Sequence, residues 1–219
     1  MHVSTAFANC DKKYITEEVF KPPVMPDKII EACEWLDDSV FKTIDKKMIE
    51  PKPNTYTYTK AIAEYLVLQE SNELPIVIVR PSIVGASLNE PFPGWLDNFN
   101  GPTGLFQAQS VGILRCMLGK REATADIIPV DVVINMMIAA AWYTGSKTNK
   151  KFYVYNCTCN KANRCTWEMI ETYCNLNSSI NPSKNVMFPP SFHFTNKRYC
   201  FYFFRGHKKF KYLMKQFFE

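Results

Sequence analysis

Tyr56 and Lys60 are the residues whose types and spacing point most clearly to catalysis. They lie four positions apart near the start of an expected helix, so both side chains fall on one face of it. A lysine ammonium close to a phenol favours the phenolate, which makes the tyrosine a usable proton donor near neutral pH. Tyr56 could then protonate a carbonyl oxygen during its reduction, with Lys60 as an electrostatic partner. An ordinary amphipathic helix explains the same spacing, and Tyr58 is expected to face away.

Residues at two expected strand ends could complete such a site. Ser4 and Thr5 follow the apolar start of the chain, where their hydroxyls could stabilise a developing oxyanion. A local turn that binds the backbone explains these two residues at least as well. Pro81 ends a second apolar run, and because it lacks an N–H it would stop the hydrogen-bond ladder there. Ligands of open α/β sheets bind beyond such carboxyl ends of strands.

The elements that must position these residues follow from apolar periodicity. Residues 74–81 are rich in Val and Ile and predict a buried parallel strand. A helix that begins at Asn54 or Thr55 and ends near Ser71 precedes this strand, and further strands are expected at 126–130 and 151–156. This alternation predicts an α/β sheet.

Four other helices and one long loop are expected. The helices are expected at residues 28–36, 107–118, 132–142 and 166–173. Asp27 is expected to cap the first and Asp131 the third. The third helix is apolar almost all round, so it is expected to be buried. The loop at 91–104 carries several prolines and glycines, and its length favours a functional role.

Composition excludes several classes of protein. The 219 residues are 47% hydrophobic with 8 glycines and 14 prolines, which excludes collagen-like and low-complexity chains. No apolar run reaches the roughly 18 residues of a membrane span. Seven of the 26 basic residues follow Thr195, so a basic, aromatic tail follows a near-neutral body. Such a tail favours contact with an anionic membrane surface. The near-neutral body argues against a protein that acts on nucleic acid. The eight cysteines lack metal-site spacing, so no metal site is predicted and reduced, cytosol-facing thiols are expected.

Taken together, these motifs resemble those of the extended short-chain dehydrogenase/reductase superfamily, and in particular the fatty acyl-CoA reductases of insects and animals. The similarity covers about residues 2 to 175 in order. The segments that carry it are 2–10, 53–61, 80–87, 90–95, 100–104, 126–131 and 154–157.

The resemblance implies NADPH-dependent reduction of a long-chain fatty acyl-CoA, through a bound aldehyde, to a fatty alcohol. Tyr56 would be the general acid, and Lys60 would favour its phenolate and hold the nicotinamide ribose. Thr5, with Ser4 as the second choice, would polarise the carbonyl. The residues expected to line the nicotinamide are Pro81, Ser82 and Ile83. The resemblance also suggests a cytosol-facing, membrane-associated protein of the endoplasmic reticulum or peroxisome.

The sequence departs from the family in having no G-x-G-x-x-G turn for the pyrophosphate. We therefore expect residues 1–180 to form the C-terminal portion of a Rossmann-like, doubly wound parallel sheet, and 181–219 to be a basic, aromatic tail or the start of a helical region. This chain alone is expected neither to bind NADPH tightly nor to turn over. Two alternatives remain open, namely another extended dehydrogenase acting on a steroid or nucleotide sugar, and a non-enzymatic remnant. Oligomeric state is not predicted.

Overall fold

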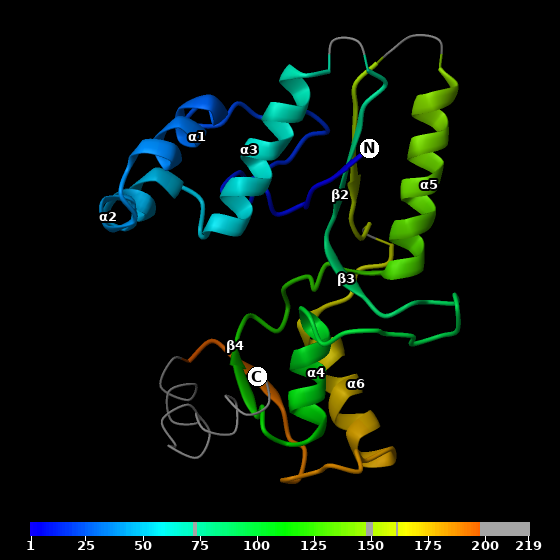
Figure 1. The fold of residues 1–219 in the computed structure, drawn as a ribbon. Coiled ribbons are helices and arrows are strands. Elements are labelled where there is room, and N and C mark those ends of the chain that lie inside the picture. The colour runs from blue at the N-terminus through cyan, green and yellow to red at the C-terminus, as the bar shows by residue number, and fades with distance from the viewer. Residues whose placement is uncertain (72–73, 148–150, 161, 198–219) are drawn as a thin grey trace. The chain divides into compact units, whose positions relative to one another are not determined.

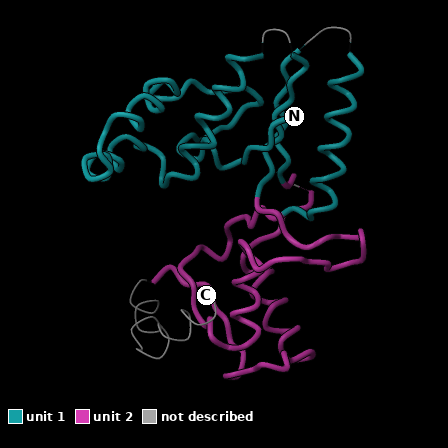
Figure 2. Tube along the Cα trace, in the orientation of Figure 1, with its two compact units in different colours: residues 1–82, 128–158 teal, residues 83–127, 159–219 magenta. Residues whose placement is uncertain are grey.

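The computed structural model describes residues 1–71, 74–147, 151–160 and 162–197. Figure 2 divides them into two compact units. Unit 1 comprises residues 1–82 and 128–158, and unit 2 comprises residues 83–127 together with the chain from 159 onward. The expected boundary near residue 180 stays a prediction.

The sheet of unit 1 contains three parallel strands in the order β1-β2-β6. These are β1 (His2–Val3), β2 (Val77–Pro81) and β6 (Tyr153–Cys157). All five residues of β2 are buried, as expected for a central parallel strand, and this confirms the prediction made from its apolar run. The order places β1 beside β2, so the two strand ends that the sequence singled out lie next to each other.

Helices cover both faces of this sheet. In Figure 1, α3 (Thr55–Gln69) lies on one side of β2 and α5 (Val130–Ser146) on the other. The predicted α/β fold is confirmed by this arrangement of parallel strands between helices. β5 (Ile127–Pro129) immediately precedes α5 at the point where the chain returns from unit 2.

The start of α3 is fixed by a local side-chain cap. The Asn54 side-chain oxygen accepts a hydrogen bond from the Thr57 amide at 2.9 Å, which satisfies one of the unpaired donors of the first turn. The sequence predicted this helix with nearly the observed ends. The cap matters for function because it sets which residues occupy the first two turns, where Tyr56 and Lys60 lie.

The segment before α3 contains two helices, α1 (Pro26–Trp35) and α2 (Asp38–Ile49). The prediction that Asp27 caps the first of them is wrong, because Pro26 occupies the first turn and Met25 is the cap. Proline fits there since its missing N–H would be unpaired anyway. The sequence did not predict α2, which has no buried residue and therefore a weak apolar signal.

Unit 2 contains β3 (Ile83–Gly85), α4 (Pro102–Ser110), β4 (Cys116–Leu118), α6 (Trp167–Ile180) and β7 (His193–Thr195). The helix predicted over 107–118 is wrong, because α4 ends at Ser110 and its last expected residues form β4, which pairs with β7. Gly112 separates the two elements at φ +80°, a conformation that glycine adopts at little cost. The core of this unit is formed by Ala108, Leu114, Phe192 and Phe194.

Two further expectations for α5 are wrong. Its N-cap is Pro129, with Asp131 inside the first turn, and the helix is not buried all round. Ile134, Ile138 and Trp142 are exposed at intervals of four residues. Within the described residues, none of the helices is both long and apolar enough to cross a membrane. The aromatic and basic segment 201–211 lies outside the described residues.

Candidate active site

The two residues with catalytic spacing lie on the first two turns of α3. Lys60 donates a hydrogen bond from Nζ to the carbonyl oxygen of Val3 at 3.0 Å. Since Val3 is the last residue of β1, this bond ties the Tyr56–Lys60 face of α3 to the end of that strand. The Tyr56 side chain is 56% exposed, so its phenol is accessible to a ligand.

Tyr58 does not belong to this face of the helix. Two residues along an α-helix correspond to a rotation of about 200°, which turns Tyr58 away from Tyr56. Tyr58 is only 5% exposed, and burial raises the pKa of its hydroxyl. The prediction that it faces away from the site is confirmed.

Ser4 and Thr5 continue β1 beyond its last paired residue. The Ser4 amide donates to the Val79 carbonyl at 2.8 Å, and the Ala6 amide donates to the Pro81 carbonyl at 2.8 Å. Both hydroxyl-bearing residues are therefore held against the carboxyl end of β2, where open α/β sheets bind ligands. The two strand ends that the sequence singled out lie together in the structure.

The hydroxyls of Ser4 and Thr5 have different surroundings. Thr5 Oγ1 donates to the Pro81 carbonyl at 3.4 Å and accepts from the Phe7 amide at 3.2 Å. The bond to the carbonyl is long, so the hydroxyl hydrogen can rotate toward a ligand at little cost. Ser4 Oγ is buried and has no hydrogen-bond partner among the described residues. The Thr5 hydroxyl thus accepts a hydrogen bond within a local turn and can also donate its hydrogen to a ligand.

The end of β2 carries the residues expected to line a nicotinamide. Pro81 is its last residue, and the Ser82 amide donates to the Cys157 carbonyl of β6 at 3.0 Å. Ser82 Oγ is buried and lacks a partner within the described part of the chain. Ile83 begins β3 in unit 2, where its amide donates to the Asp126 carbonyl at 3.0 Å.

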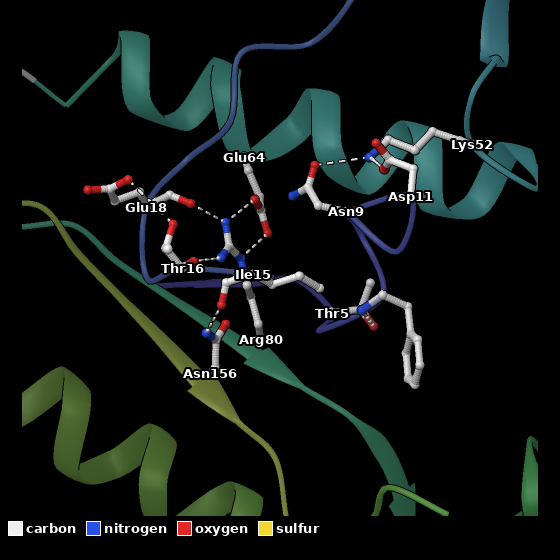
Figure 3. A network of polar contacts seen from close by, with 11 residues as sticks. Thr5, Asn9, Asp11, Ile15, Thr16, Glu18, Lys52, Glu64, Arg80 and Asn156 are labelled. Carbon is white, nitrogen blue, oxygen red and sulfur yellow. Dashed lines mark hydrogen bonds and ion pairs between the residues drawn. The ribbon is translucent and has the colours of Figure 1, made fainter. Parts of the chain in front are cut away.

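A buried ion pair joins α3 to β2 (Figure 3). Arg80 donates from Nε to Glu64 Oε1 at 2.8 Å and from Nη2 to Glu64 Oε2 at 2.7 Å. Arg80 also donates to the backbone carbonyls of Thr16 and Glu18, at 2.9 and 2.7 Å. Both charged side chains are essentially excluded from solvent. One guanidinium therefore holds α3, β2 and the 16–18 segment together.

The function of this pair was missed from the sequence, although its signal was present. Glu64 lies four residues after Lys60 on α3, and Arg80 interrupts an otherwise apolar strand. A buried charge requires a partner of opposite charge, so Arg80 in the strand indicates a nearby carboxylate. The sequence alone does not identify which acidic residue supplies it.

His2 lies beside the same face of α3. Burial lowers the pKa of His2, the positive charge of Lys60 lowers it further, and the carboxylate of Glu64 opposes both effects. The Nε2 atom of His2 is buried without a hydrogen-bond partner among the described residues. The neutral imidazole is thus the favoured form in the folded chain.

Comparison with known proteins identifies a matching family model and similar relatives. Residues 1–137 match an NAD-binding family model described as "Male sterility protein". The chain is 51% identical over 203 residues to fatty acyl-CoA reductase 1 of Xenopus laevis, which covers 93% of this chain and 39% of that protein. It is also 51% identical over 167 residues to fatty acyl-CoA reductase 2 of Mus musculus, covering 76% of this chain and 32% of that protein. The chain thus spans about two fifths or less of these relatives' lengths.

Among solved structures, the fold resembles that of UDP-glucuronic acid 4-epimerase from Bacillus cereus in complex with NAD. The TM-score is 0.50 at 17% sequence identity, and the match covers 90% of this chain and 52% of the epimerase. At this identity the likeness concerns the fold.

Proposed function

Because the chain belongs to the family that the male sterility protein model describes, we propose that it supplies the catalytic face of an NADPH-dependent fatty acyl-CoA reductase. Its substrate is a long-chain fatty acyl-CoA, which is reduced through a bound aldehyde to a fatty alcohol. The observation that carries the proposal is the Lys60–Val3 hydrogen bond of 3.0 Å. It brings the face of Tyr56 and Lys60 to the strand end that bears Ser4 and Thr5.

The proton chemistry is assigned to Tyr56. When a carbonyl carbon receives a hydride, negative charge grows on its oxygen, and Tyr56 donates the phenolic proton to that oxygen. Lys60 stabilises the phenolate that remains, because the two residues lie one helical turn apart on the same face of α3. Such proton transfer contributes about 10²–10⁴-fold to a rate.

The carbonyl oxygen is oriented by Thr5. The Thr5 hydroxyl turns from the Pro81 carbonyl, 3.4 Å away, to the substrate oxygen and stabilises its developing charge. Ser4 is the second choice, since its hydroxyl is unpartnered among the described residues but buried. In the first reduction the thiol of coenzyme A leaves and takes up a proton, and the aldehyde is reduced in the second.

The residues present fit the nicotinamide end of a dinucleotide. Ser82 offers a buried hydroxyl without a partner in the described residues, at the carboxyl end of β2. Pro81, Ser82 and Ile83 would line the ring, and Tyr56 and Lys60 would hold the adjoining ribose. The bound cofactor supplies the hydride. The family model supports a nicotinamide dinucleotide, and NADPH in preference to NADH is part of the proposal.

A second candidate is an extended dehydrogenase or epimerase that acts on a nucleotide sugar, which the fold likeness to the epimerase favours. The sequence identity of 51% to fatty acyl-CoA reductases over 93% of the chain favours the acyl-CoA substrate. A non-enzymatic protein would have no need of the accessible phenol of Tyr56 beside Lys60 on α3.

One assay separates these possibilities. The full polypeptide that contains this chain is incubated with NADPH and palmitoyl-CoA, a steroid ketone or a UDP-sugar, and the product is analysed. Fatty alcohol from palmitoyl-CoA supports the proposal, whereas turnover of only the other substrates, or of none, contradicts it.

We also propose that the protein acts at the cytosolic surface of the endoplasmic reticulum or peroxisome. Support comes from the basic, aromatic composition after residue 195, which suits an anionic lipid surface. Co-sedimentation with vesicles that contain phosphatidylserine, compared with neutral vesicles, tests this.

A further inference from the structure

A small cavity of about 210 Å³ lies in unit 1, on the side of α3 away from the catalytic face. Its wall combines segments 9–12, 21–23 and 51–52 with residues of α3. Tyr58 is one of these α3 residues, and it points about 200° away from Tyr56 around the helix. Neither Tyr56 nor Lys60 lines the cavity, so it is separate from the site described above.

The cavity carries more positive than negative charge. Lys12, Lys21 and Lys52 line it, against the single carboxylate of Asp11. Lys52 is buried and donates from Nζ to Asn9 Oδ1 at 3.0 Å and to Asp11 Oδ1 (Figure 3). Burial tends to raise the pKa of Asp11, but the hydrogen bond from Lys52, a backbone hydrogen bond and the charges of Lys52 and Lys12 outweigh it and lower the pKa.

The charges of Lys52 and Asp11 therefore compensate each other, which leaves Lys12 and Lys21 as the excess. Both of these residues are exposed, and the Lys12 ammonium lies 5.0 Å from the centre of the Phe20 ring. The lining thus has two more ammonium groups than carboxylates, which matches the charge of about −1.5 to −2 that a phosphate monoester carries at neutral pH.

Tyr58 adds an unused polar group to the cavity wall. Its side chain is 5% exposed, and its hydroxyl has no hydrogen-bond partner among the described residues. Because burial raises its pKa, the hydroxyl stays protonated and can donate at neutral pH. A buried polar group without a partner is unfavourable, and a bound acceptor would remove that cost.

Size limits the ligand further. Pockets that enclose a whole drug-sized molecule measure about 300–1,000 Å³, so this cavity suits one end of a larger molecule or a small anion. Prolines and aliphatic residues of α3 make up the rest of the wall and would contact apolar atoms next to the anion.

We infer that this cavity binds a phosphate monoester through Lys12, Lys21 and the hydroxyl of Tyr58. The group has two possible sources. One is the 3′-phosphate of coenzyme A, an assignment that rests on the proposed function, and the other is a free small phosphate ester.

Binding of coenzyme A, 3′-dephospho-coenzyme A and inorganic phosphate is measured by calorimetry on the full polypeptide. The Lys12→Ala/Lys21→Ala variant removes two charges at the cavity. The matched control is Lys42→Ala/Lys47→Ala, which removes two exposed charges from α2 of the same unit. Tyr58→Phe removes the hydroxyl without changing the charge, and it serves as the second variant if the first does not fold.

We expect the cavity variant to lose roughly tenfold in affinity for a phosphate monoester, as for the loss of charge-assisted hydrogen bonds, while the control keeps it. Tyr58→Phe should weaken the same binding. Equal losses in the cavity and control variants, or no binding of any of the ligands, overturn the site. An unchanged affinity in Tyr58→Phe overturns the assigned hydroxyl contact.

The three ligands distinguish the sources. Tighter binding of coenzyme A than of its 3′-dephospho form, with the difference lost in the cavity variant, supports the substrate's 3′-phosphate. Binding of inorganic phosphate alone supports a small free phosphate as the source and counts against the assignment that rests on the proposed function. If the cavity binds none of the three ligands, the result expected in the fatty alcohol assay does not change, so the two proposals can fail independently.

Discussion

Arg80 of β2 and Glu64 of α3 form a two-point ion pair of 2.8 and 2.7 Å, with both side chains excluded from solvent. Such a pair is favourable only when further hydrogen bonds satisfy the charges, and Arg80 finds them at the carbonyls of Thr16 and Glu18. The pair fixes α3 against β2 sixteen residues away in sequence. The placement of the Lys60 face of α3 at the end of β1 thus depends on a buried pair further along the same helix.

Glu64→Gln should strongly destabilise the chain. The substitution removes the charge that compensates the buried guanidinium, and breaking a buried pair in this way costs about 3–5 kcal/mol. Urea denaturation measures the effect. Glu31→Gln is the matched control, because Glu31 pairs with Lys28 at 3.2 Å on the surface of α1, where an ion pair contributes less than about 1 kcal/mol. Similar midpoints for the two variants would refute the central role of the buried pair.

Gly112→Ala should destabilise unit 2. Gly112 has φ +80°, and an added Cβ would lie 2.0 Å from the carbonyl oxygen of Phe188, which is backbone and cannot turn aside. We expect a loss of more than about 1 kcal/mol in the free energy of unfolding.

The control for this substitution is Gly145→Ala in α5, where the added Cβ meets nothing within 4 Å. Alanine there should stabilise the helix by about 0.5–1 kcal/mol. A shift of both variants in the same direction in thermal unfolding would contradict the steric conflict assigned to Gly112.

Stability should fall as the pH drops below about 6.5, the ordinary pKa of histidine, because the folded chain lowers the pKa of His2. In that range the unfolded chain binds more protons than the folded one, so the free energy of unfolding increases with pH. His2→Gln should flatten this dependence between about pH 5 and 7 in urea titrations.

A separate loss of stability is expected at lower pH and should persist in the His2→Gln variant. The folded chain lowers the pKa of Asp11 from 3.8, so the stability that its carboxylate contributes is lost as the pH falls below that value. Identical slopes for the wild type and His2→Gln between pH 5 and 7 would contradict the role given to His2.

Thr5→Val should lower kcat by about 10²–10³, the effect of removing one donor to a developing oxyanion. Valine keeps the shape of threonine, and Thr5→Ser keeps the hydroxyl and should retain most of the activity. The measurement is fatty alcohol formation by the full polypeptide. If Ser4→Ala is the more damaging variant and Thr5→Val is active, the donor is Ser4 instead.

What the sequence predicted well was local. The Asn54 cap, the spacing of Tyr56 and Lys60, and the apolar run of β2 each depend on a few neighbouring residues, and all three were foreseen. What it missed depends on contacts between distant segments. The pairing of β4 with β7 converts residues 116–118 from expected helix to strand, and the partner of Arg80 could not be chosen from composition.

The exposed stripe of α5 illustrates the same limit. Periodicity showed a helix that is apolar almost all round, and the usual inference is complete burial. In unit 1 the sheet covers only part of that surface, which leaves Ile134, Ile138 and Trp142 exposed. Burial depends on what packs against a helix, and the helix sequence alone does not contain that information.

The most direct test of the central claim is Tyr56→Phe in the full polypeptide, assayed for fatty alcohol formed from palmitoyl-CoA and NADPH. Removal of the general acid should lower kcat by about 10²–10⁴. Tyr65→Phe is the control, because Tyr65 lies on the same helix about 180° from Tyr56 and should keep its activity. A Tyr56→Phe variant as active as Tyr65→Phe would contradict the assignment of Tyr56 as the proton donor.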